Sequence, residues 1–386
     1  MNREQREIPV FVQRMTSTTR GFAAPWRYIQ GPGEFDRIGE YSKDYSSSVY
    51  VLMDSLLYDK LGNRLRESFN GTDTLLYLDK FGGECCQREI DRVTEEIKSR
   101  GAGLAIAIGG GKTLDTVKVA AIAQNIHLMI VPTSAANDAP VSALAVVYTE
   151  TGAHDHSIVF NRGSDLVLVD SDIIMKSPRR LLVAGMGDAL STYFEACACS
   201  ARRMKNAVGC LPCKVAMSIA RLSFDILMED SVKALIAQEA GVVNEAFENI
   251  VEVNVLMSGL GFQNTGCSMA HAINAGLSEL PEAGAYLHGE RVGFGVLVQL
   301  VFENRPMEEI HRIMDYLASV GLPMTLAQVG VEATPEKIGI MAEKMVYHNG
   351  LAHAQCDVLN KDTVEAAIRV ADAMGHAYQN GQLFCG

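Results

Sequence analysis

Short apolar runs alternate with longer amphipathic segments in the first half of the chain. The apolar runs cover residues 49–53, 74–77, 104–108, 128–131 and 166–169. Each run has the length and the content of aliphatic or β-branched residues that are typical of a buried strand. Segments with helical spacing follow the first three runs, over residues 56–69, 87–99 and 114–124. This alternation predicts an α/β fold, with a mostly parallel sheet that carries helices on both faces.

A change of pattern after residue 177 predicts a second domain. Residues 142–150 alternate as a strand and residues 157–160 can return as a hairpin partner, but from Pro178 onward the spacing is helical almost to Gly386. We therefore expect an α/β domain over residues 26–177 and an all-helical domain over residues 178–386. Residues 1–25 form an amino-terminal extension without clear periodicity. If it is ordered, such an extension must be tied down, and we expect it to pack on a neighbouring subunit or on the α/β domain.

Composition and charge narrow the possible partners. The chain has 386 residues, 48% of them hydrophobic, which is enough for two domains. A net charge of -12 without a basic cluster argues against a nucleic-acid partner. No apolar run approaches the roughly 20 residues that cross a bilayer, and charged residues interrupt the first 25 positions. We expect a soluble, cytoplasmic protein that binds neither nucleic acid nor membrane.

The nine cysteines do not form a disulfide framework in so long a chain. Four of them have spacings that we interpret as those of reduced, mostly buried thiols; these are Cys197, Cys199, Cys210 and Cys213. Cys85 and Cys86 follow a pair of glycines in a loop, which favours a more exposed position. The pattern does not predict their reactivity.

A glycine run marks a candidate phosphate site. Gly109, Gly110 and Gly111 lie where the third predicted strand gives way to a helix, so unpaired N–H groups and the helix dipole favour an anion there. Lys112 can add positive charge. The run matches neither of the common nucleotide-binding motifs, and a simple tight turn explains it equally well in isolation. Asp54 ends the first strand at the same edge of the sheet, where its carboxylate can accept hydrogen bonds from a ribose diol and repel a 2′-phosphate. Together these features favour NAD over NADP.

Two histidines and one aspartate in the helical region form a candidate metal site. Taken alone, His271 and His288 are better explained as hydrogen-bonded core residues, and Asp188 as a helix cap. His288 precedes a helix, whose dipole keeps the ring neutral for ligation. Two imidazoles and one carboxylate would leave one position open, as in a catalytic rather than a structural zinc site.

The order of these segments resembles a known family. Asp54, the turn at residues 109–115, the segments 132–140 and 187–190, and His271 with residues 288–290 follow one another as in bacterial glycerol dehydrogenases, the zinc-dependent branch of the iron-containing alcohol dehydrogenase superfamily. The resemblance runs from about Tyr28 to the carboxyl end. It implies a Rossmann-like domain followed by a helical domain, as in dehydroquinate synthase, and NAD-dependent oxidation of glycerol to dihydroxyacetone. It also implies a homo-oligomer, an octamer by analogy.

The resemblance assigns roles to individual residues. It implies Zn2+ on Asp188, His271 and His288, and glycerol near Asp138 and His271 with Phe262 lining the pocket; Asp138 and the three metal ligands would carry catalysis. The implied NAD-binding residues are Asp54, Gly110, Gly111, Lys112, Thr113, Asp115, Thr133, Ser134, Ala136, Ser142, Leu144 and Tyr148.

Three positions depart from the wider family pattern. Iron-dependent members carry a histidine four residues after the aspartate, and this chain has Thr192 there, which fits a three-ligand zinc site. Asn274 stands where relatives often have a second histidine, and Asn137 replaces a common threonine beside Asp138. These two changes affect the fit of the substrate without removing a ligand.

Three alternatives to glycerol oxidation stay open at this point. The same architecture serves related dehydrogenases that act on another diol or an aldehyde. A dehydroquinate-synthase-like lyase is less favoured, because no Lys or Arg lies in residues 271–287 to bind a phosphorylated substrate. A silent NAD-binding protein would have Asp188 as a cap and both histidines in the core.

Overall fold

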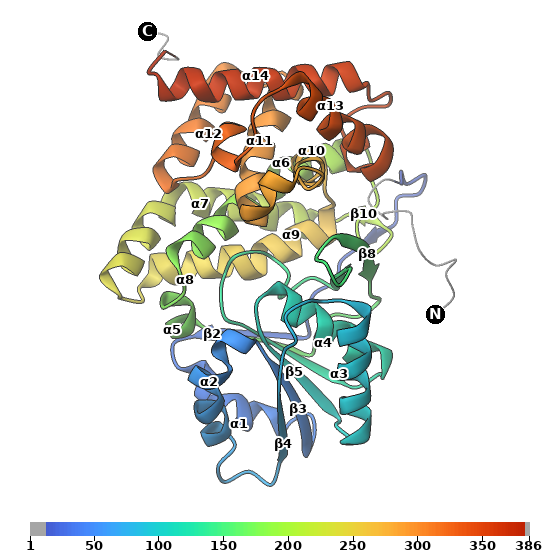
Figure 1. Cartoon of the computed structure of the whole chain (residues 1–386), viewed down its shortest axis with the longest axis vertical. Helices are drawn as coiled ribbons and strands as arrows, with labels where there is room; N and C mark the ends of the chain where they lie inside the picture. The colour runs from blue at the N-terminus through green and yellow to red at the C-terminus, as the bar shows by residue number, and fades with distance from the viewer. Residues whose placement is uncertain (1–12, 383–386) are drawn as a thin grey trace. The chain divides into compact units, whose positions relative to one another are not determined.

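The computed structural model describes residues 13–382, which divide into two compact units (Figure 1). One unit contains the main sheet and comprises residues 23–178 and 237–259. The other is mainly helical and comprises residues 13–22, 179–236 and 260–382. The sequence predicts a parallel-sheet region followed by a helical region, and that prediction is confirmed by a parallel six-stranded sheet followed by a largely helical region.

The sheet of the first unit is parallel throughout and has the order β2-β9-β6-β5-β3-β4. Its strands are β2 (Arg27–Gly31), β3 (Ser48–Met53), β4 (Leu75–Lys80), β5 (Leu104–Gly109), β6 (His127–Pro132) and β9 (Leu166–Asp170). Five of them coincide with the predicted apolar runs. β2 was not predicted, because its sequence, Arg-Tyr-Ile-Gln-Gly, is too polar for a buried strand. It pairs with β9 at the edge of the sheet.

Helices cover both faces of this sheet. The odd-numbered residues of β3 and the even-numbered residues of β5 pack with Phe35, Ile38 and Leu65 in one apolar cluster. The helices of this unit are α1 (Ile38–Ser42), α2 (Ser55–Ser68), α3 (Gln87–Ser99), α4 (Gly111–Ala123), α5 (Ser171–Met175) and α8 (Glu245–Glu252). α4 packs on β5 and β6 from the face opposite α1 and α2 (Figure 1). A separate antiparallel hairpin joins β7 (Leu144–Tyr148) to β8 (His154–Val159), close to the predicted positions.

A late segment of the chain belongs to the sheet-containing unit. Residues 237–259 lie inside the predicted helical domain of residues 178–386, but they group with the sheet. The side chain of Gln30 in β2 donates to the Glu248 backbone carbonyl at 2.9 Å, and Ser171 donates to the Glu248 carboxylate at 2.6 Å. Asn254 donates to the carbonyl of Ala135 at 3.0 Å. Helical spacing alone gives no sign of these long-range polar contacts.

The second unit is built from helices that lie far apart in sequence. They are α6 (Arg179–Ala201), α7 (Lys214–Ala240, of which residues up to 236 belong here), α9 (Ser258–Thr265, from residue 260), α10 (Met269–Leu277), α11 (His288–Phe302), α12 (Met307–Val320), α13 (Pro335–Glu343) and α14 (Lys361–Gln379). Among residues 13–382, no helix is both long and apolar enough to pass through a bilayer.

The described part of the amino-terminal extension, residues 13–22, contacts the helical unit and not the α/β domain. β1 (Arg20–Gly21) pairs in parallel with β10 (Leu211–Pro212), and the Met15 N–H donates to the Arg203 carbonyl at 2.8 Å. Backbone hydrogen bonds of this kind need no apolar pattern, so the sequence did not reveal the partner. The prediction for residues 1–12 lies outside the described residues.

Cys85 and Cys86 are buried, so the prediction of greater exposure is wrong. The carbonyl of Cys85 accepts the Tyr148 N–H at 2.8 Å, which holds this loop against β7. Burial raises the pKa of the Cys85 thiol to about 12. The eight cysteines between residues 13 and 382 are free thiols. Of the four predicted to be mostly buried, Cys199 is buried, whereas Cys197, Cys210 and Cys213 are only partly buried.

Candidate metal centre and cofactor turn

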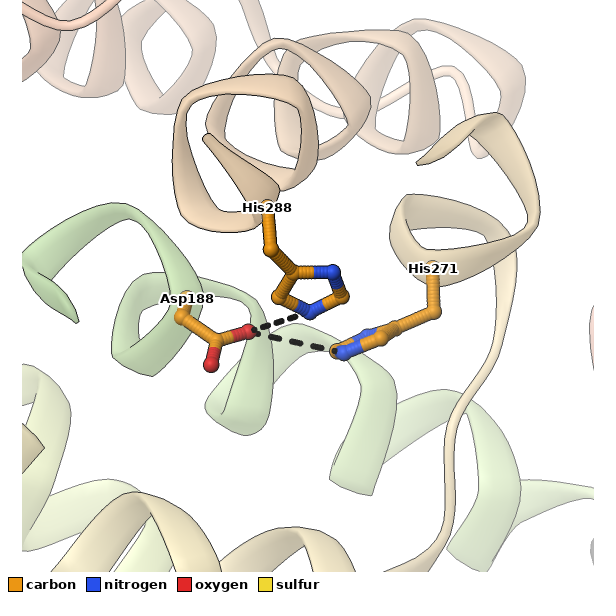
Figure 2. A group of neighbouring side chains, drawn as sticks. All are labelled: Asp188, His271 and His288. Atoms are coloured by element: carbon orange, nitrogen blue, oxygen red, sulfur yellow. Dashed lines mark ion pairs between the residues drawn. The ribbon is translucent and has the colours of Figure 1, made fainter. Parts of the chain in front are cut away.

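Asp188, His271 and His288 converge inside the helical unit (Figure 2). They come from α6, α10 and the first residue of α11. Oδ1 of Asp188 lies 3.2 Å from Nε2 of His288 and 3.5 Å from Nε2 of His271. The two imidazole centroids are 5.3 Å apart. Three donor atoms thus meet at one point, although each belongs to a different helix.

Glycines let these three helices approach closely. A β-carbon at Gly289 would lie 1.7 Å from the Ala184 carbonyl oxygen, and one at Gly187 would lie 2.2 Å from the Gly289 carbonyl oxygen. A β-carbon at Gly295 would lie 2.4 Å from the Ala270 carbonyl oxygen. The distance between helix axes depends on the side chains at the contact. The glycines next to Asp188 and His288 therefore bring α6 and α11 together at the position of the ligands.

An ion pair between the exposed Arg180 and the buried Glu290 also ties α11 to α6. The Arg180 guanidinium donates to both carboxylate oxygens of Glu290, at 2.6 and 2.7 Å. The same Glu290 carboxylate accepts the Leu287 N–H at 2.7 Å, at the start of α11. This bidentate arrangement fixes both distance and orientation. The ion pair thus holds His288, which follows Leu287, at the start of α11.

The electrostatics of the centre favour a cation. Burial raises the pKa of the Asp188 carboxyl, but the facing imidazoles of His288 and His271 more than offset this, so its pKa lies well below the usual range. Burial lowers the pKa of His271, whereas Cys267, Glu195 and Asp188 raise it, and the net pKa is above the usual value. The buried carboxylates on either side of His271 thus stabilise positive charge there.

The donor set and its spacing fit a transition metal. Imidazole nitrogens and a carboxylate oxygen are common ligands of zinc, and donors about 2.0–2.2 Å from a tetrahedral ion lie roughly 3.3–3.6 Å from one another. The separation of 3.5 Å falls in this range, and that of 3.2 Å lies just below it. Among the described residues the group has three members, and Thr192, one turn after Asp188, is buried close to Gly261. Three protein ligands leave a position for another molecule.

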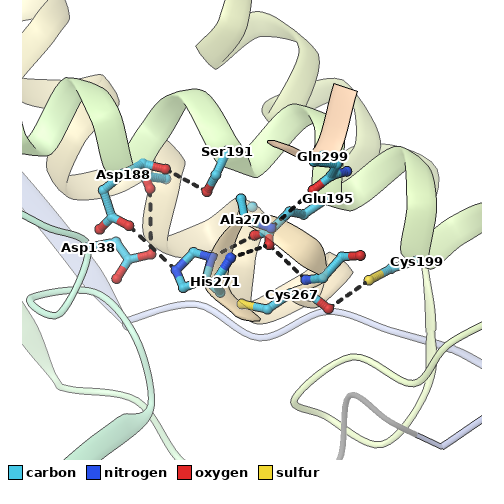
Figure 3. A network of polar contacts seen from close by, with 12 residues as sticks. Asp138, Asp188, Ser191, Glu195, Cys199, Cys267, Ala270, His271 and Gln299 are labelled. Atoms are coloured by element: carbon cyan, nitrogen blue, oxygen red, sulfur yellow. Dashed lines mark hydrogen bonds and ion pairs between the residues drawn. The ribbon is translucent and has the colours of Figure 1, made fainter. Parts of the chain in front are cut away.

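A buried glutamate behind His271 was missed by the sequence analysis. Oε2 of Glu195 lies 2.6 Å from Nδ1 of His271, on the side of the ring opposite Asp188 (Figure 3). Glu195 follows Asp188 by seven residues on α6, so both carboxylates lie on one face of the helix. This seven-residue spacing is the sequence signal that could have revealed Glu195. Cys267 also lies near Glu195 and His271, and their donor atoms form a second cluster that shares the same imidazole.

The glycine turn forms a pocket in the sheet-containing unit. Its volume is about 400 Å³. The lining residues are Asp54, Ser55, Leu56, Phe81, Gly83, Gly110, Gly111, Lys112 and Thr113. Gly110 is the N-cap residue of α4 and has no side chain to cap the first N–H groups, and within residues 13–382 the buried Thr113 hydroxyl has no hydrogen-bond partner. Uncapped N–H groups at a helix start suit a phosphate, so the pocket fits part of a dinucleotide.

The charged residues of this pocket already have partners. Oδ1 of Asp54 accepts the Leu56 N–H at 2.9 Å and caps α2. The Lys112 ammonium lies 2.6 Å from the Glu84 carboxylate and 5.1 Å from the centre of the Tyr148 ring. Lys112 therefore brings less net charge to the pocket than its position in the sequence indicates.

Asp115 is engaged inside the unit and does not line the pocket. Its two carboxylate oxygens accept the Lys118 ammonium and the Val146 N–H, each at 3.0 Å. The buried Lys118 also donates to the carbonyls of Ala139 and Leu144, at 2.5 and 2.9 Å. The pair thus fixes the loop that precedes β7. Any contribution of Asp115 to cofactor binding is therefore indirect.

The other predicted cofactor residues lie on or beside this loop rather than in the pocket. The Thr133 N–H donates to the Gly109 carbonyl at 3.2 Å, and the Ser142 hydroxyl donates to the Ala139 carbonyl at 3.3 Å. Leu144 and Tyr148 are the end residues of β7. The remaining two predicted positions are Ser134 and Ala136, in the segment after β6.

The two predicted substrate residues outside the metal group fall in different units. Phe262 of the helical unit stacks on His271, with ring centroids 6.3 Å apart and an interplanar angle of 17°. Asp138 belongs to the sheet-containing unit, where its Oδ2 lies 3.5 Å from the Ser258 hydroxyl. Phe262 thus gives the metal group an aromatic neighbour.

A parallel sheet with a glycine turn at a helix start, followed by helices that bring an aspartate and two histidines to one point, is an arrangement typical of metal-dependent oxidoreductases. The model of the iron-containing alcohol dehydrogenase family matches residues 25–171. Glycerol dehydrogenase of Citrobacter freundii is 40% identical over 356 residues, which are 92% of this chain and 98% of that protein.

Two solved structures are similar over nearly the whole chain. A probable glycerol dehydrogenase from Sinorhizobium meliloti 1021 is 41% identical with a TM-score of 0.88, and the match covers 93% of this chain and 99% of that one. Glycerol dehydrogenase from Schizosaccharomyces pombe is 31% identical with a TM-score of 0.90, covering 97% and 95%. The chain belongs to the iron-containing alcohol dehydrogenase family, in its glycerol dehydrogenase group.

Proposed function

We propose that this chain catalyses the reversible, NAD-dependent oxidation of glycerol to dihydroxyacetone, with zinc held by Asp188, His271 and His288. The observation that carries the proposal is the convergence of these three donors from three helices. Its spacing suits a small transition-metal ion with an open position. The proposal is also supported by glycerol dehydrogenases that are about 40% identical over nearly the full chain.

Zinc is favoured over iron by the ligand count. The position one helical turn after Asp188 holds Thr192, where iron-dependent relatives carry a further histidine. A β-carbon at Gly261 would lie 2.3 Å from the methyl group of Thr192, so this part of α6 packs tightly on α9. When bound, zinc supplies a Lewis acid that lowers the pKa of an alcohol hydroxyl.

The residues around the centre have separate tasks in the reaction. Oxidation removes a hydride from the central carbon of glycerol and a proton from its hydroxyl. When bound, NAD would supply the hydride acceptor, and the proton would leave to water. Phe262 provides a flat apolar surface beside His271, which limits access of water to that ligand. We assign Asp138 to orienting the hydroxyl groups of the polyol.

The glycine turn is the proposed place for the phosphates of NAD. Gly110 and Gly111 offer backbone N–H groups at the start of α4, and the buried hydroxyl of Thr113, which has no hydrogen-bond partner within residues 13–382, offers a further donor. Asp54 lines the same pocket and carries the negative charge that disfavours a 2′-phosphate. The loop that contains Thr133, Ser142 and Leu144 would support the rest of the cofactor.

On family resemblance we also propose that the protein is a homo-oligomer, an octamer by analogy. The mass of the native protein in solution, measured by light scattering, checks this. A monomer at micromolar concentration would contradict it.

The activity is tested by following NADH formation from glycerol, propane-1,2-diol and simple alcohols, with and without a chelator. We expect glycerol and propane-1,2-diol to be oxidised, simple primary alcohols to react poorly, and chelation to stop the reaction. Restoration by zinc but not by iron identifies the metal. Full activity after complete removal of metal would contradict the proposal, and preference for a simple alcohol would change the substrate.

A further inference from the structure

Glu195 has no assigned role, yet it is almost fully buried beside the metal centre, with 1% of its surface exposed. A buried carboxylate is costly unless hydrogen bonds satisfy it. Three hydrogen bonds to its carboxylate oxygens come from one short stretch, residues 268–271 at the start of α10. Its position therefore serves α10 and the histidine that α10 carries.

One oxygen of Glu195 caps the start of α10. Oε1 accepts the N–H groups of Ser268 and His271, at 2.8 and 2.9 Å. Ser268 is the residue before the helix, and its own side chain makes no capping bond. The first N–H groups of a helix have no partners within the helix. The Glu195 carboxylate on α6 accepts these N–H groups and so fixes the position of the first turn of α10, which carries His271.

The other oxygen fixes the imidazole ring. Oε2 lies 2.6 Å from Nδ1 of His271, while Nε2 of the same ring points to Oδ1 of Asp188 at 3.5 Å (Figure 3). A carboxylate that accepts from Nδ1 places the proton of the neutral ring on that nitrogen and leaves the Nε2 lone pair free for a metal. Rotation of the ring by half a turn would break this bond and point a carbon at the ligand position.

We infer that Glu195 is a positioning residue, which acts through His271 to hold the neutral tautomer and the ring orientation that metal binding at Nε2 requires. The inference rests on the proposed metal centre. Partners of this kind typically change metal affinity by about 10- to 100-fold when they are replaced. The alternative is that Glu195 only caps α10 and influences the metal through folding.

The chain offers a matched control for that alternative. The buried side chain of Gln299 on α11 accepts the Ala270 N–H at 3.3 Å, so it also supports the start of α10. No hydrogen bond between Gln299 and the His271 ring is present among residues 13–382. Gln299→Ala therefore weakens the cap without changing the tautomer of His271.

The test compares zinc affinity, measured by competition with a chromophoric chelator, in the wild type, Glu195→Gln and Gln299→Ala. We expect Glu195→Gln to keep one zinc per chain at saturation but to bind it about 10- to 100-fold more weakly. Gln299→Ala should bind zinc nearly as tightly as the wild type. The visible spectrum of the cobalt-substituted protein should change in Glu195→Gln alone, because only there does the ligand field of His271 change.

Equal losses in the two variants, or unchanged affinity in Glu195→Gln, would overturn the inference while leaving the metal centre intact. A wild type without zinc would overturn the proposed function as well. If Glu195→Gln does not fold, Glu195→Asp replaces it. This variant keeps the charge with a shorter reach, so its zinc affinity should fall less, and no fall would again overturn the inference.

Discussion

The metal centre and the glycine turn are built in opposite ways. The centre uses side chains from α6, α10 and α11, which are distant in sequence and meet only through helix packing. The turn is continuous in sequence, from β5 into α4, and offers mainly backbone groups. A site made of side chains can be removed by one substitution. A backbone site depends instead on the glycines that expose it and on the contacts that hold its neighbours.

The largest expected effect follows from removing one metal ligand. His271→Ala should lose the bound metal and lower kcat at least about a hundredfold, because Lewis-acid stabilisation is worth several kcal/mol. The dissociation constant of NADH, measured by fluorescence, should stay nearly unchanged, since the predicted cofactor residues belong to the other unit.

Asp188→Asn serves as a second variant of the same centre, because it removes the charge with little change in shape. We expect it to give the same separation between turnover and NADH binding. Normal turnover by metal-stripped His271→Ala protein would refute the assignment. A loss of NADH binding equal to the loss of turnover would show that the two regions do not act separately.

The next largest effect concerns the stability of the sheet-containing unit. Lys118→Met leaves the buried Asp115 without its cation, and breaking a buried pair in this way costs about 3–5 kcal/mol. Denaturant unfolding measures the loss. The double variant Lys118→Met/Asp115→Asn keeps an acceptor for the Val146 N–H without a buried charge, and it should recover part of the stability.

The same pair predicts a pH dependence. Burial raises the pKa of Asp115 although Lys118 lowers it in part, so the folded state holds this proton to a higher pH than the unfolded chain does. Stability from this group is therefore present at low pH and is lost as the pH rises through the folded pKa. Lys118→Met should be more destabilised at about pH 7 than at about pH 5. Equal loss at both values would contradict this account of the pair.

The smallest expected effect is a change in the preference for NAD over NADP when Asp54 is replaced. Asp54→Asn removes the charge that disfavours a 2′-phosphate but keeps an oxygen that caps α2, since Asn and Asp cap equally well. The ratio of kcat/KM for NADP to that for NAD should rise about tenfold, which corresponds to about 1.4 kcal/mol. An unchanged thermal midpoint is the control for the cap. An unchanged ratio would show that Asp54 acts only as a cap.

The same contrast explains what the sequence could and could not predict. Five of the six strands of the sheet and the turn at Gly109 are local patterns of apolar and glycine residues, so their positions followed directly from the sequence. The residues proposed for the metal centre needed the family resemblance, because each of Asp188, His271 and His288 alone is better explained as a structural residue. In the structure, Oδ1 of Asp188 lies within 3.5 Å of Nε2 of both histidines.

The features that escaped prediction are long-range polar contacts. Glu195 joins α6 to α10, Glu248 is bound by Gln30 and Ser171, and β1 pairs with β10 of the helical unit. None of these leaves a periodic signal, because a single hydrogen bond needs only one suitable side chain. The burial of Cys85 has the same origin, since the loop is held by a backbone bond to Tyr148.

Metal reconstitution tests the division of labour between the two regions most directly. Wild-type protein is stripped of metal and titrated with zinc, while glycerol-dependent NADH formation and NADH affinity are followed in the same samples. The account predicts that activity rises in proportion to zinc and reaches its maximum at one zinc per chain, with NADH affinity constant throughout. Activity without metal, or NADH binding that appears only together with zinc, would contradict it.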